Sequence, residues 1–308
     1  MNILSNFSYI FDILKSENIS GGVLKDEPMS LHTSFKTGGP ADVFVSPADE
    51  NELKKVIEIL KKENAPTFVI GNGTNLLVKD NGIRGVVVHI GKGFSYINTK
   101  NEEITAGAGC LMSEIAQNAL DNSLTGFEFA SGIPGSFGGG MFMNAGAYDG
   151  EMKNVLKTAK VLDRNTLEIF EISAEELDLG YRKSSVEAKG YIVLEGTIKL
   201  GKGDYDKIKD KMNDLNSQRR EKQPLTFPSA GSTFKRPEGY FAGKLISDSG
   251  LKGFSVGGAQ VSEKHAGFVI NKGNATTADI LSVIKHCQET VFDNYGVMLE
   301  TEVRILGE

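Results

Sequence analysis

The stretch from Ser131 to Glu151 reads SGIPGSFGGGMFMNAGAYDGE, and seven of its 21 residues are glycine. Glycine lets the backbone turn sharply and approach a ligand or a neighbouring segment closely. A flexible linker would be rich in Gly and Ser and otherwise polar, but this stretch also carries Ile133, Phe137 and Met141. The pattern favours an ordered, partly buried loop in backbone contact with a ligand, and a purely structural loop is the open alternative.

Neither of the two common glycine-rich nucleotide motifs fits the chain. A Walker A loop needs a Gly-Lys-Ser/Thr ending, and GSFGGGMF (135–142) has no lysine. A second glycine stretch, GNGTNLLV (71–78), follows the predicted strand PTFVIG (66–71). A Rossmann motif would need a third glycine and a following helix, whereas its sixth position is Leu76 and a strand pattern follows. An anion-binding backbone loop and an ordinary tight turn both stay open for this stretch.

Composition limits the class of protein. The chain has 308 residues, 40% hydrophobic and 24% charged, with a net charge of −6. These values predict a folded chain of two or three domains and disfavour general nucleic-acid binding. The two cysteines, Cys110 and Cys287, and four scattered histidines predict neither a disulfide framework nor a metal site.

The first 18 residues, MNILSNFSYIFDILKSEN, place Asp12 within an apolar pattern and lack a basic start. They predict an amphipathic helix and not a signal peptide. The chain has no run of about 18 apolar residues, so we expect no membrane span and a cytoplasmic location.

Periodicity predicts a mixed α+β chain without the regular strand–helix alternation of a doubly wound fold. Predicted helices occupy 49–64, 112–122, the stretch after 210 to about 220, and 277–295. Predicted strands occupy 66–71, 84–91, 103–110, 191–200, 266–271 and 299–306, with a hairpin over 159–172 that turns at Arg164–Thr166. The last predicted helix carries Ile280, Ile284, Cys287, Val291 and Phe292 on one side. The polar segment GKGDYDKIKD (201–210) is a plausible domain boundary.

Three further segments carry polar groups. Ser232 in PSAGSTFKRP (228–237) lies outside any GxSxG elbow, so its residues alone indicate a turn residue or a helix cap. YRKSS (181–185) is a short polar run. In LETEVRILG (299–307), a strand would place Glu300, Glu302 and Arg304 on one face, which is typical of a solvated surface with an ion pair.

Taken in order, these motifs resemble the UDP-N-acetylenolpyruvoylglucosamine reductase (MurB) family, from TSFKTGGPAD (33–42) to EVRILG (302–307). LKGFSVGGAQVSEKHAGFVIN (251–271) matches the same pattern. The resemblance implies an FAD-binding fold of the vanillyl-alcohol-oxidase (PCMH) type, followed by a smaller α+β substrate-binding domain. The FAD-binding region would span 1–203, in two α/β lobes of about 1–90 and 91–203. The substrate domain would span 204–308, and its last strand could return to the FAD region.

The resemblance also implies a reaction. NADPH would reduce non-covalently bound FAD, which would then reduce the enolpyruvyl group of UDP-N-acetylenolpyruvoylglucosamine to UDP-N-acetylmuramate. That oxidoreductase serves peptidoglycan precursor synthesis, and so cell-wall biogenesis, cell shape and cell division. The partner would be a UDP-sugar, with no nucleic acid, no membrane, no metal and no obligate protein partner.

By the same resemblance, the catalytic residues are Arg182, Ser232 and Glu302. The flavin-binding residues are Gly71, Asn72, Gly73, Thr74, Asn75, Ser131, Gly132, Pro134, Gly135, Ser136, Gly139, Gly140, Asn144 and Gly146. The substrate-binding residues are Lys222, Lys235, Arg236 and Lys252.

These roles fit the chemistry of the residue types. Hydride addition to an unsaturated carboxylate builds negative charge that needs preorganised donors, and the arginine fork suits a carboxylate. Ser232 would protonate the α-carbon. Glu302, beside an anion, would have to be protonated or to hydrogen-bond the enol.

The chain resembles the shorter subgroup of the family. Only 50 positions separate Arg182 from Ser232, too few for the tyrosine-bearing loop of the longer subgroup, which also has an asparagine in place of Arg236. One alternative is an FAD oxidase of the same superfamily acting on a small alcohol or sugar, but about 108 residues after Leu200 leave little room for its larger cap. A second alternative is a non-catalytic flavin or nucleotide-sugar binding protein.

Overall fold

The computed structural model describes residues 3–308, which form two compact units, each with its own apolar core. The first unit contains the chain as far as Lys25, Val43–Asn72 and Gly85–Gln218; the second contains Asp26–Asp42, Gly73–Arg84 and Arg219–Glu308. The sequence predicts a flavin-binding region up to residue 203 and a substrate-binding region from residue 204, and this division by ligand stays a prediction. Two segments from within 1–203 fold with the second unit.

The first unit contains five helices within the described residues. They are α1 (Ile3–Ser16), α2 (Glu50–Lys62), α3 (Met112–Asp121), α4 (Phe137–Phe142) and α5 (Tyr205–Lys222), which runs past the end of the unit. Among them, α2 and α3 follow the apolar periodicity. The predicted helix over 49–64 is confirmed: Asp49 accepts a hydrogen bond from the Glu52 N–H, and the apolar face of α2 is buried. The predicted N-terminal helix is confirmed over the described residues; Met1 and Asn2 lie outside them.

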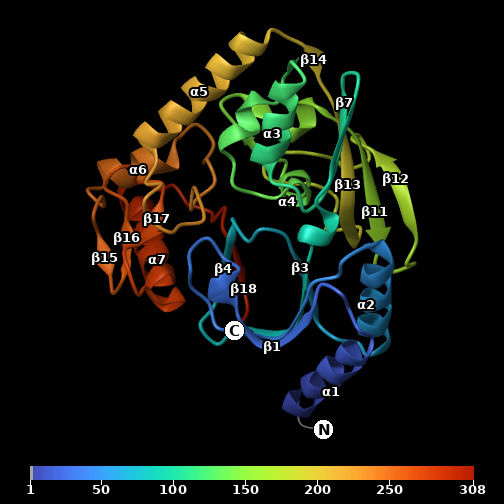
Figure 1. The fold of residues 1–308 in the computed structure, drawn as a ribbon. Coiled ribbons are helices and arrows are strands. Elements are labelled where there is room, and N and C mark those ends of the chain that lie inside the picture. Colours follow the sequence, from blue (N-terminus) through green and yellow to red (C-terminus); the bar gives the residue numbers. More distant parts are fainter. Residues whose placement is uncertain (1–2) are drawn as a thin grey trace. The chain divides into compact units, whose positions relative to one another are not determined.

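The main sheet of the first unit is antiparallel, with strand order β12-β11-β13-β7-β6. Its strands are β6 (Ile97–Lys100), β7 (Glu103–Gly107), β11 (Leu156–Asp163), β12 (Ile169–Ser173) and β13 (Tyr191–Lys199), and β11, β12 and β13 lie next to one another in Figure 1. The predicted hairpin is therefore confirmed as β11–β12. A second sheet has the order β1-β2-β5-β3 and contains β1 (Val23–Pro28), β2 (Pro40–Val45), β3 (Thr67–Ile70) and β5 (Ile83–His89).

The glycine-rich stretch is partly helical, which corrects the prediction of a loop. Ser136 caps α4, with its Oγ accepting from the Gly139 N–H. The buried side chains of Phe137 and Met141 rest on β13 at Gly196, where a Cβ would come within 2.9 Å of the phenyl ring and 2.7 Å of the Met141 sulfur. Because β13 has glycine there, α4 can pack tightly on the middle of the sheet.

The second unit is built around α7 (Thr277–Tyr295), as predicted over 277–295. Thr276 and Asp279 form a capping box at its start, and Gly296 ends it with φ +67°. The predicted apolar side extends one residue too far: Val291 is buried, but Phe292 is 48% exposed. An antiparallel sheet, β15-β16-β17, and helix α6 belong to the same unit; they comprise β15 (Ser255–Val256), β16 (Ala259–Val261), β17 (Val269–Asn271) and α6 (Ala242–Asp248).

The last strand is shorter than predicted. Only β18 (Arg304–Leu306) is regular, and it pairs in parallel with β4 (Leu76–Val78), which comes from the predicted FAD-binding stretch of the chain. Glu300 and Glu302 precede β18, so the predicted strand face shared with Arg304 does not form.

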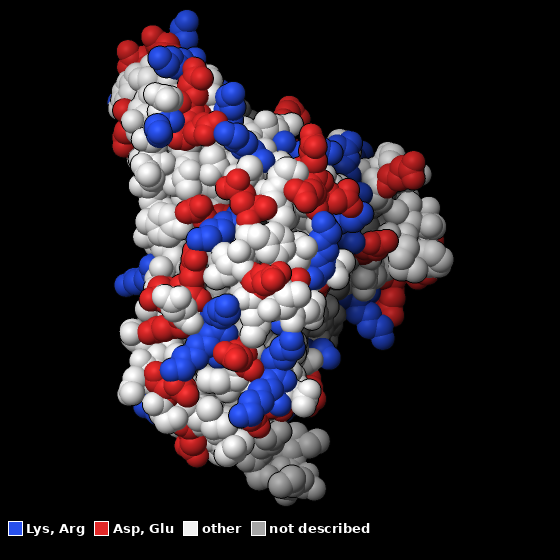
Figure 2. Space-filling model, turned by 90° about the vertical axis from the view of Figure 1, so that its right-hand side faces the viewer, with Lys and Arg blue, Asp and Glu red and all other residues white. Residues whose placement is uncertain are grey.

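The remaining elements are short. They are β8 (Leu124–Thr125) paired with β14 (Gly201–Lys202), β9 (Gly146–Ala147) paired with β10 (Gly150–Glu151), and the 3-10 turns η1 (Met29–Leu31), η2 (Lys92–Phe94), η3 (Glu128–Gly132) and η4 (Met152–Asn154). The face drawn in Figure 2 intersperses acidic and basic side chains. Within residues 3–308, no helix is long and apolar enough to cross a membrane.

Candidate active site

The two glycine-rich stretches come together in the first unit. A Cβ on Gly71 would lie 2.2 Å from Ser136 Oγ, so the two backbones approach as closely as glycine allows. The Asn72 side-chain amide donates to the Pro134 carbonyl at 2.7 Å. The structure thus brings the predicted flavin residues Gly71 and Asn72 beside the predicted set from Ser131 to Ser136.

Backbone hydrogen bonds fix the second glycine stretch just after Ser136. The N–H groups of Phe137 and Gly138 donate to the Cys110 and Ala108 carbonyls, both at 2.8 Å. A Cβ on Gly138 would lie 2.8 Å from the Ala108 Cβ, and one on Gly140 would lie 2.8 Å from the Met112 sulfur. These two glycines therefore face the core.

Gly139 differs from its neighbours. A Cβ there would meet nothing nearer than Ser136 Oγ at 3.3 Å, and Gly139 is half-buried. A ligand can approach this backbone without a side chain in between, and an extra side chain would enter that space. An anchored glycine backbone with one open position fits a bound flavin nucleotide.

The end of the first glycine stretch belongs to the second unit. Gly73 has φ +61°, and a Cβ there would lie 1.9 Å from the His32 carbonyl oxygen, so only glycine fits. Thr74 is half-buried. Asn75 accepts the Arg304 N–H at 2.9 Å through its carbonyl, and its side-chain amide donates to the Glu302 carbonyl at 3.0 Å.

The segments that carry Ser232 and Glu302 pair with each other in the second unit. The Glu302 N–H donates to the Thr233 carbonyl at 2.9 Å, and Phe234 forms an isolated antiparallel bridge with Thr301. Ser232 is exposed and Glu302 is half-buried. Two residues 70 positions apart in the chain are therefore held on adjacent backbone segments.

Arg182 lies in the first unit and has a left-handed backbone, with φ +53°. Its guanidinium lies 5.2 Å from the centre of the Tyr181 ring, and one of its nitrogens lies 3.5 Å from the Gly146 carbonyl oxygen. A non-glycine residue in this conformation stores strain, a feature that clusters at functional sites.

Asn144 supports the segment just before Arg182. It is fully buried, and its amide donates to Glu151 Oε2 at 3.0 Å and to the Gly180 carbonyl at 3.1 Å. Its own side-chain oxygen accepts the Lys153 N–H at 2.9 Å. Sequence reasoning assigned Asn144 to the flavin and missed this supporting role, because residue type alone does not show a partner 36 positions away.

The predicted substrate-binding cations lie mostly at the surface of the second unit. Lys235 forms an ion pair with Glu300 at 3.0 Å, and the Arg236 guanidinium lies 4.0 Å from the centre of the Phe241 ring. Lys222 ends α5, and both it and Lys252 are exposed. Burial holds the pKa of His265 below its ordinary value, and the positive charge of Lys252 lowers it further.

Thr233 is a second residue that sequence reasoning missed. It is fully buried, its N–H donates to the Gly267 carbonyl at 2.8 Å, and its Oγ1 accepts the Val269 N–H at 2.9 Å. It thereby fixes Ser232 against β17. A threonine beside a predicted catalytic serine was the only signal in the sequence.

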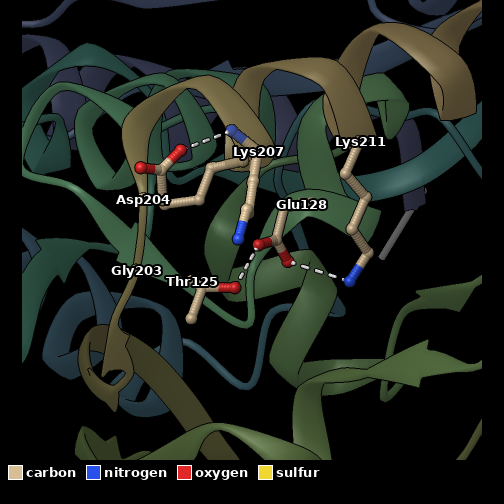
Figure 3. Close-up of a pocket in the computed structure, with 7 residues that line it drawn as sticks. Thr125, Glu128, Gly203, Asp204, Lys207 and Lys211 are labelled. Carbon is tan, nitrogen blue, oxygen red and sulfur yellow. Dashed lines mark hydrogen bonds and ion pairs between the residues drawn. The ribbon is translucent and has the colours of Figure 1, made fainter.

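A surface hollow of about 260 Å³ lies elsewhere in the first unit (Figure 3). It is lined by Thr125, Glu128, Gly203, Asp204, Lys207, Ile208 and Lys211, none of them a predicted site residue. Burial raises the pKa of Glu128, but hydrogen bonds from Thr125 Oγ1 and the Gly126 N–H and the charge of Lys211 outweigh it and hold that pKa below its ordinary value.

Two known families match different parts of the chain, and both agree with the resemblance found in the sequence. Residues 41–172 match the FAD binding domain family, and residues 223–306 match the C-terminal domain of UDP-N-acetylenolpyruvoylglucosamine reductase. The expected FAD cofactor and the α+β FAD-binding fold are thereby confirmed.

Individual relatives agree over the whole chain. UDP-N-acetylenolpyruvoylglucosamine reductase of Clostridium kluyveri is 52% identical over 309 residues, covering 100% of both chains. That of Clostridium perfringens is 57% identical over 282 residues, covering 92% of each. The crystal structure of the Thermus caldophilus reductase (MurB) superposes with a TM-score of 0.81 at 33% identity, covering 93% of this chain and 98% of that one. The chain belongs to the UDP-N-acetylenolpyruvoylglucosamine reductase family.

Proposed function

We propose that the chain reduces the enolpyruvyl group of UDP-N-acetylenolpyruvoylglucosamine to UDP-N-acetylmuramate in peptidoglycan precursor synthesis, with NADPH as the reductant. Bound FAD supplies the hydride transfer between NADPH and the enolpyruvyl double bond. The observation that carries the proposal is the backbone pairing of the exposed Ser232 segment with the Glu302 segment. This pairing holds a serine and a glutamate on adjacent backbone segments within one unit.

The glycine backbone around Gly71, Ser136 and Gly139 would hold the flavin nucleotide. Support comes from the close approach of the two stretches and from the open position at Gly139. Backbone N–H groups that approach a diphosphate closely can hydrogen-bond it, and glycine is the residue that permits this approach. The other predicted flavin residues belong to the same two stretches or, like Asn144 and Gly146, follow them.

Arg182 would bind the carboxylate of the enolpyruvyl group. A guanidinium is charged at every physiological pH, and its planar fork matches a carboxylate. Hydride addition to the double bond increases the negative charge on the carboxylate. A fixed cation beside it therefore stabilises the transition state more than it stabilises the bound substrate.

Ser232 would then deliver the proton to the α-carbon. A serine hydroxyl is a weak acid, but an enolate is a strong enough base to accept its proton when the two are held together. Glu302 would donate or share a hydrogen bond with the enol oxygen. Its half-buried position in the structure is consistent with that role.

The cations Lys222, Lys235, Arg236 and Lys252 would bind the diphosphate of the UDP-sugar. Lys235 forms an ion pair with Glu300 at the surface. Because a surface ion pair contributes little free energy, little would be lost if Lys235 left Glu300 to bind a phosphate. We further propose a cytoplasmic enzyme that needs no partner protein, nucleic acid or membrane, with the FAD-binding region in 1–203 and the substrate-binding region in 204–308.

The function is tested anaerobically with the purified holoenzyme. NADPH should bleach the flavin absorbance, and UDP-N-acetylenolpyruvoylglucosamine should restore it with formation of UDP-N-acetylmuramate. A flavin that NADPH bleaches but this sugar does not restore contradicts the proposal. Oxygen consumption with a small alcohol or sugar, without NADPH, would instead identify the oxidase alternative.

The role of Ser232 is tested by Ser232→Ala. We expect bleaching by NADPH at the normal rate and a turnover lower by about 10²-fold or more, as for the loss of a general acid. Ser229→Ala, three residues earlier in the same loop, is the matched control and should keep its turnover. Equal slowing of both half-reactions in Ser232→Ala would refute a role in protonation.

A further inference from the structure

Glu302 stands outside any regular strand, yet its backbone is fixed on both sides. The strand β18 begins only at Arg304, so the ladder with β4 does not reach Glu302. Its N–H donates to the Thr233 carbonyl at 2.9 Å, and its carbonyl accepts from the Asn75 side-chain amide at 3.0 Å. These two bonds replace the ladder that a longer strand would have provided.

Asn75 immediately precedes β4 and is itself held by the pairing of β4 with β18. Its carbonyl accepts the Arg304 N–H at 2.9 Å, the bond that opens the β4–β18 pairing. Asn75 therefore contacts the chain on both sides of Val303: by its backbone at Arg304, and by its side chain at Glu302. Such a clamp fixes the peptide plane after Glu302, and with it the direction of the Glu302 Cα–Cβ bond.

The two asparagines of GNGTN (71–75) serve different parts of the molecule. The Asn72 amide donates to the Pro134 carbonyl in the other glycine stretch, in the first unit. The Asn75 amide donates to the Glu302 carbonyl, in the second unit. A motif assigned wholly to the flavin thus has one asparagine that joins the glycine stretches and one that contacts the backbone of a proposed catalytic residue.

We infer that the Asn75 side chain positions Glu302, so that in the flavin-loaded enzyme its loss slows reduction of the enolpyruvyl group more than it slows reduction of the flavin by NADPH. The inference rests on the proposed function of Glu302. The physical reason is that a carboxyl group must be held within a fraction of an ångström to act on a reacting atom, and a misplacement of 1 Å can cost about 10²-fold in rate. In the proposed mechanism Glu302 acts on the enolpyruvyl group and not in hydride transfer from NADPH, so that step should be insensitive to its position.

Asn75→Asp tests the inference, because it keeps the shape of the side chain and removes the donor. With the flavin site filled by added FAD, we expect restoration of the absorbance by the enolpyruvyl sugar to be slowed about 10- to 100-fold more than bleaching by NADPH. Asn75→Leu removes the donor without adding a charge and should give the same pattern. If Asp at this position prevents folding, Leu decides the question; slowing that occurs with Asp and not with Leu reflects the added charge and overturns the inference.

Two control variants separate positioning from a general loss of structure. Asn271→Asp removes a side-chain bond of the same type and length, to the Phe35 carbonyl at 3.0 Å in the same unit, and should leave both half-reactions within about twofold. Asn72→Asp should instead lower flavin content. Equal slowing of both half-reactions in FAD-saturated Asn75→Asp, or unchanged kinetics, would each overturn the inference.

A double-mutant cycle with Glu302→Gln shows whether Asn75 acts through Glu302. In that background Asn75→Asp should slow the sugar half-reaction by less than twofold, because the group that it positions has already been altered. A full additional 10-fold loss would assign Asn75 a separate role. If the wild-type enzyme bleached by NADPH is not restored by the sugar, the proposed function fails before any variant is compared.

Discussion

Gly71 and Ser136 approach so closely that a Cβ on the glycine would lie 2.2 Å from the serine Oγ and 3.3 Å from its Cβ. Ser136 also caps α4, with its Oγ 3.4 Å from the Gly139 N. This close approach joins the two glycine-rich stretches. It also involves the first turn of α4, the helix formed by part of the second stretch.

Gly71→Ala should displace Ser136 and disturb both stretches. We expect a loss of stability of about 1–3 kcal/mol, as for overpacking, and weaker flavin retention, measured by urea unfolding and by the flavin absorbance after gel filtration. Ser136→Ala alone should cost about 1 kcal/mol through the lost cap.

The double variant Gly71→Ala, Ser136→Ala provides the check on this contact. It should be less destabilised than the two single variants together, because the Oγ that the new methyl group meets is absent. Strict additivity would show that the contact does not limit the approach of the two stretches.

Gly139→Val should separate flavin binding from folding. The valine Cβ would press on Ser136 Oγ at 3.3 Å, a milder contact than that at Gly140, and the rest of the side chain would enter the space beside the glycine backbone. We therefore expect a small change in the unfolding midpoint and loss of the bound flavin. Gly140→Ala is the control, since its Cβ would lie 2.8 Å from the Met112 sulfur, and it should destabilise the apoprotein by about 1–3 kcal/mol. Retention of flavin by Gly139→Val would place the cofactor elsewhere.

Asn144→Asp should misplace Arg182. The change puts a carboxylate against Glu151 and against the Gly180 carbonyl, where the amide now donates twice. Both acceptors are half-buried, and the Gly180 carbonyl also accepts the Lys183 N–H, so the main cost comes from the like charge of the new carboxylate beside Glu151; we expect a loss of stability in urea unfolding and a lower kcat. Adding Glu151→Gln supplies an amide donor to the new carboxylate and should recover part of the loss; no recovery would mean that the Asn144–Glu151 bond is unimportant.

Glu128 should give the protein an acid-sensitive component of stability. Its pKa is lower in the fold than the ordinary value, so its contribution is present above the ordinary pKa and is lost as the pH falls through the folded pKa. At pH 7, Glu128→Gln should cost about 1.5–3 kcal/mol, as for hydrogen bonds to a charged group.

The difference in unfolding free energy between the wild type and Glu128→Gln should shrink as the pH is lowered below about 4.5. Urea unfolding at a series of pH values measures it, and Glu263→Gln, a carboxylate of the second unit, serves as the control. A difference that is constant with pH would mean that the charge on Glu128 contributes nothing.

Local sequence determined the elements whose signals are contained within one stretch. The apolar period and Asp49 define α2, and Thr276, Asp279 and Gly296 define both ends of α7. The order of the motifs was enough to predict the family and the FAD-binding fold, because each motif is a short run of residue types. None of these conclusions required knowing which distant segment lies nearby.

Tertiary structure decided the features that depend on a distant partner. The glycine stretch begins a helix because Gly196 of β13 makes room for Phe137 and Met141. β18 has three residues because its partner β4 is itself three residues long, and Glu302 is instead fixed by Thr233 and Asn75. Residue types determine what a side chain can bind, but only the fold determines which partner is within 3 Å, since hydrogen bonding depends on distance and angle.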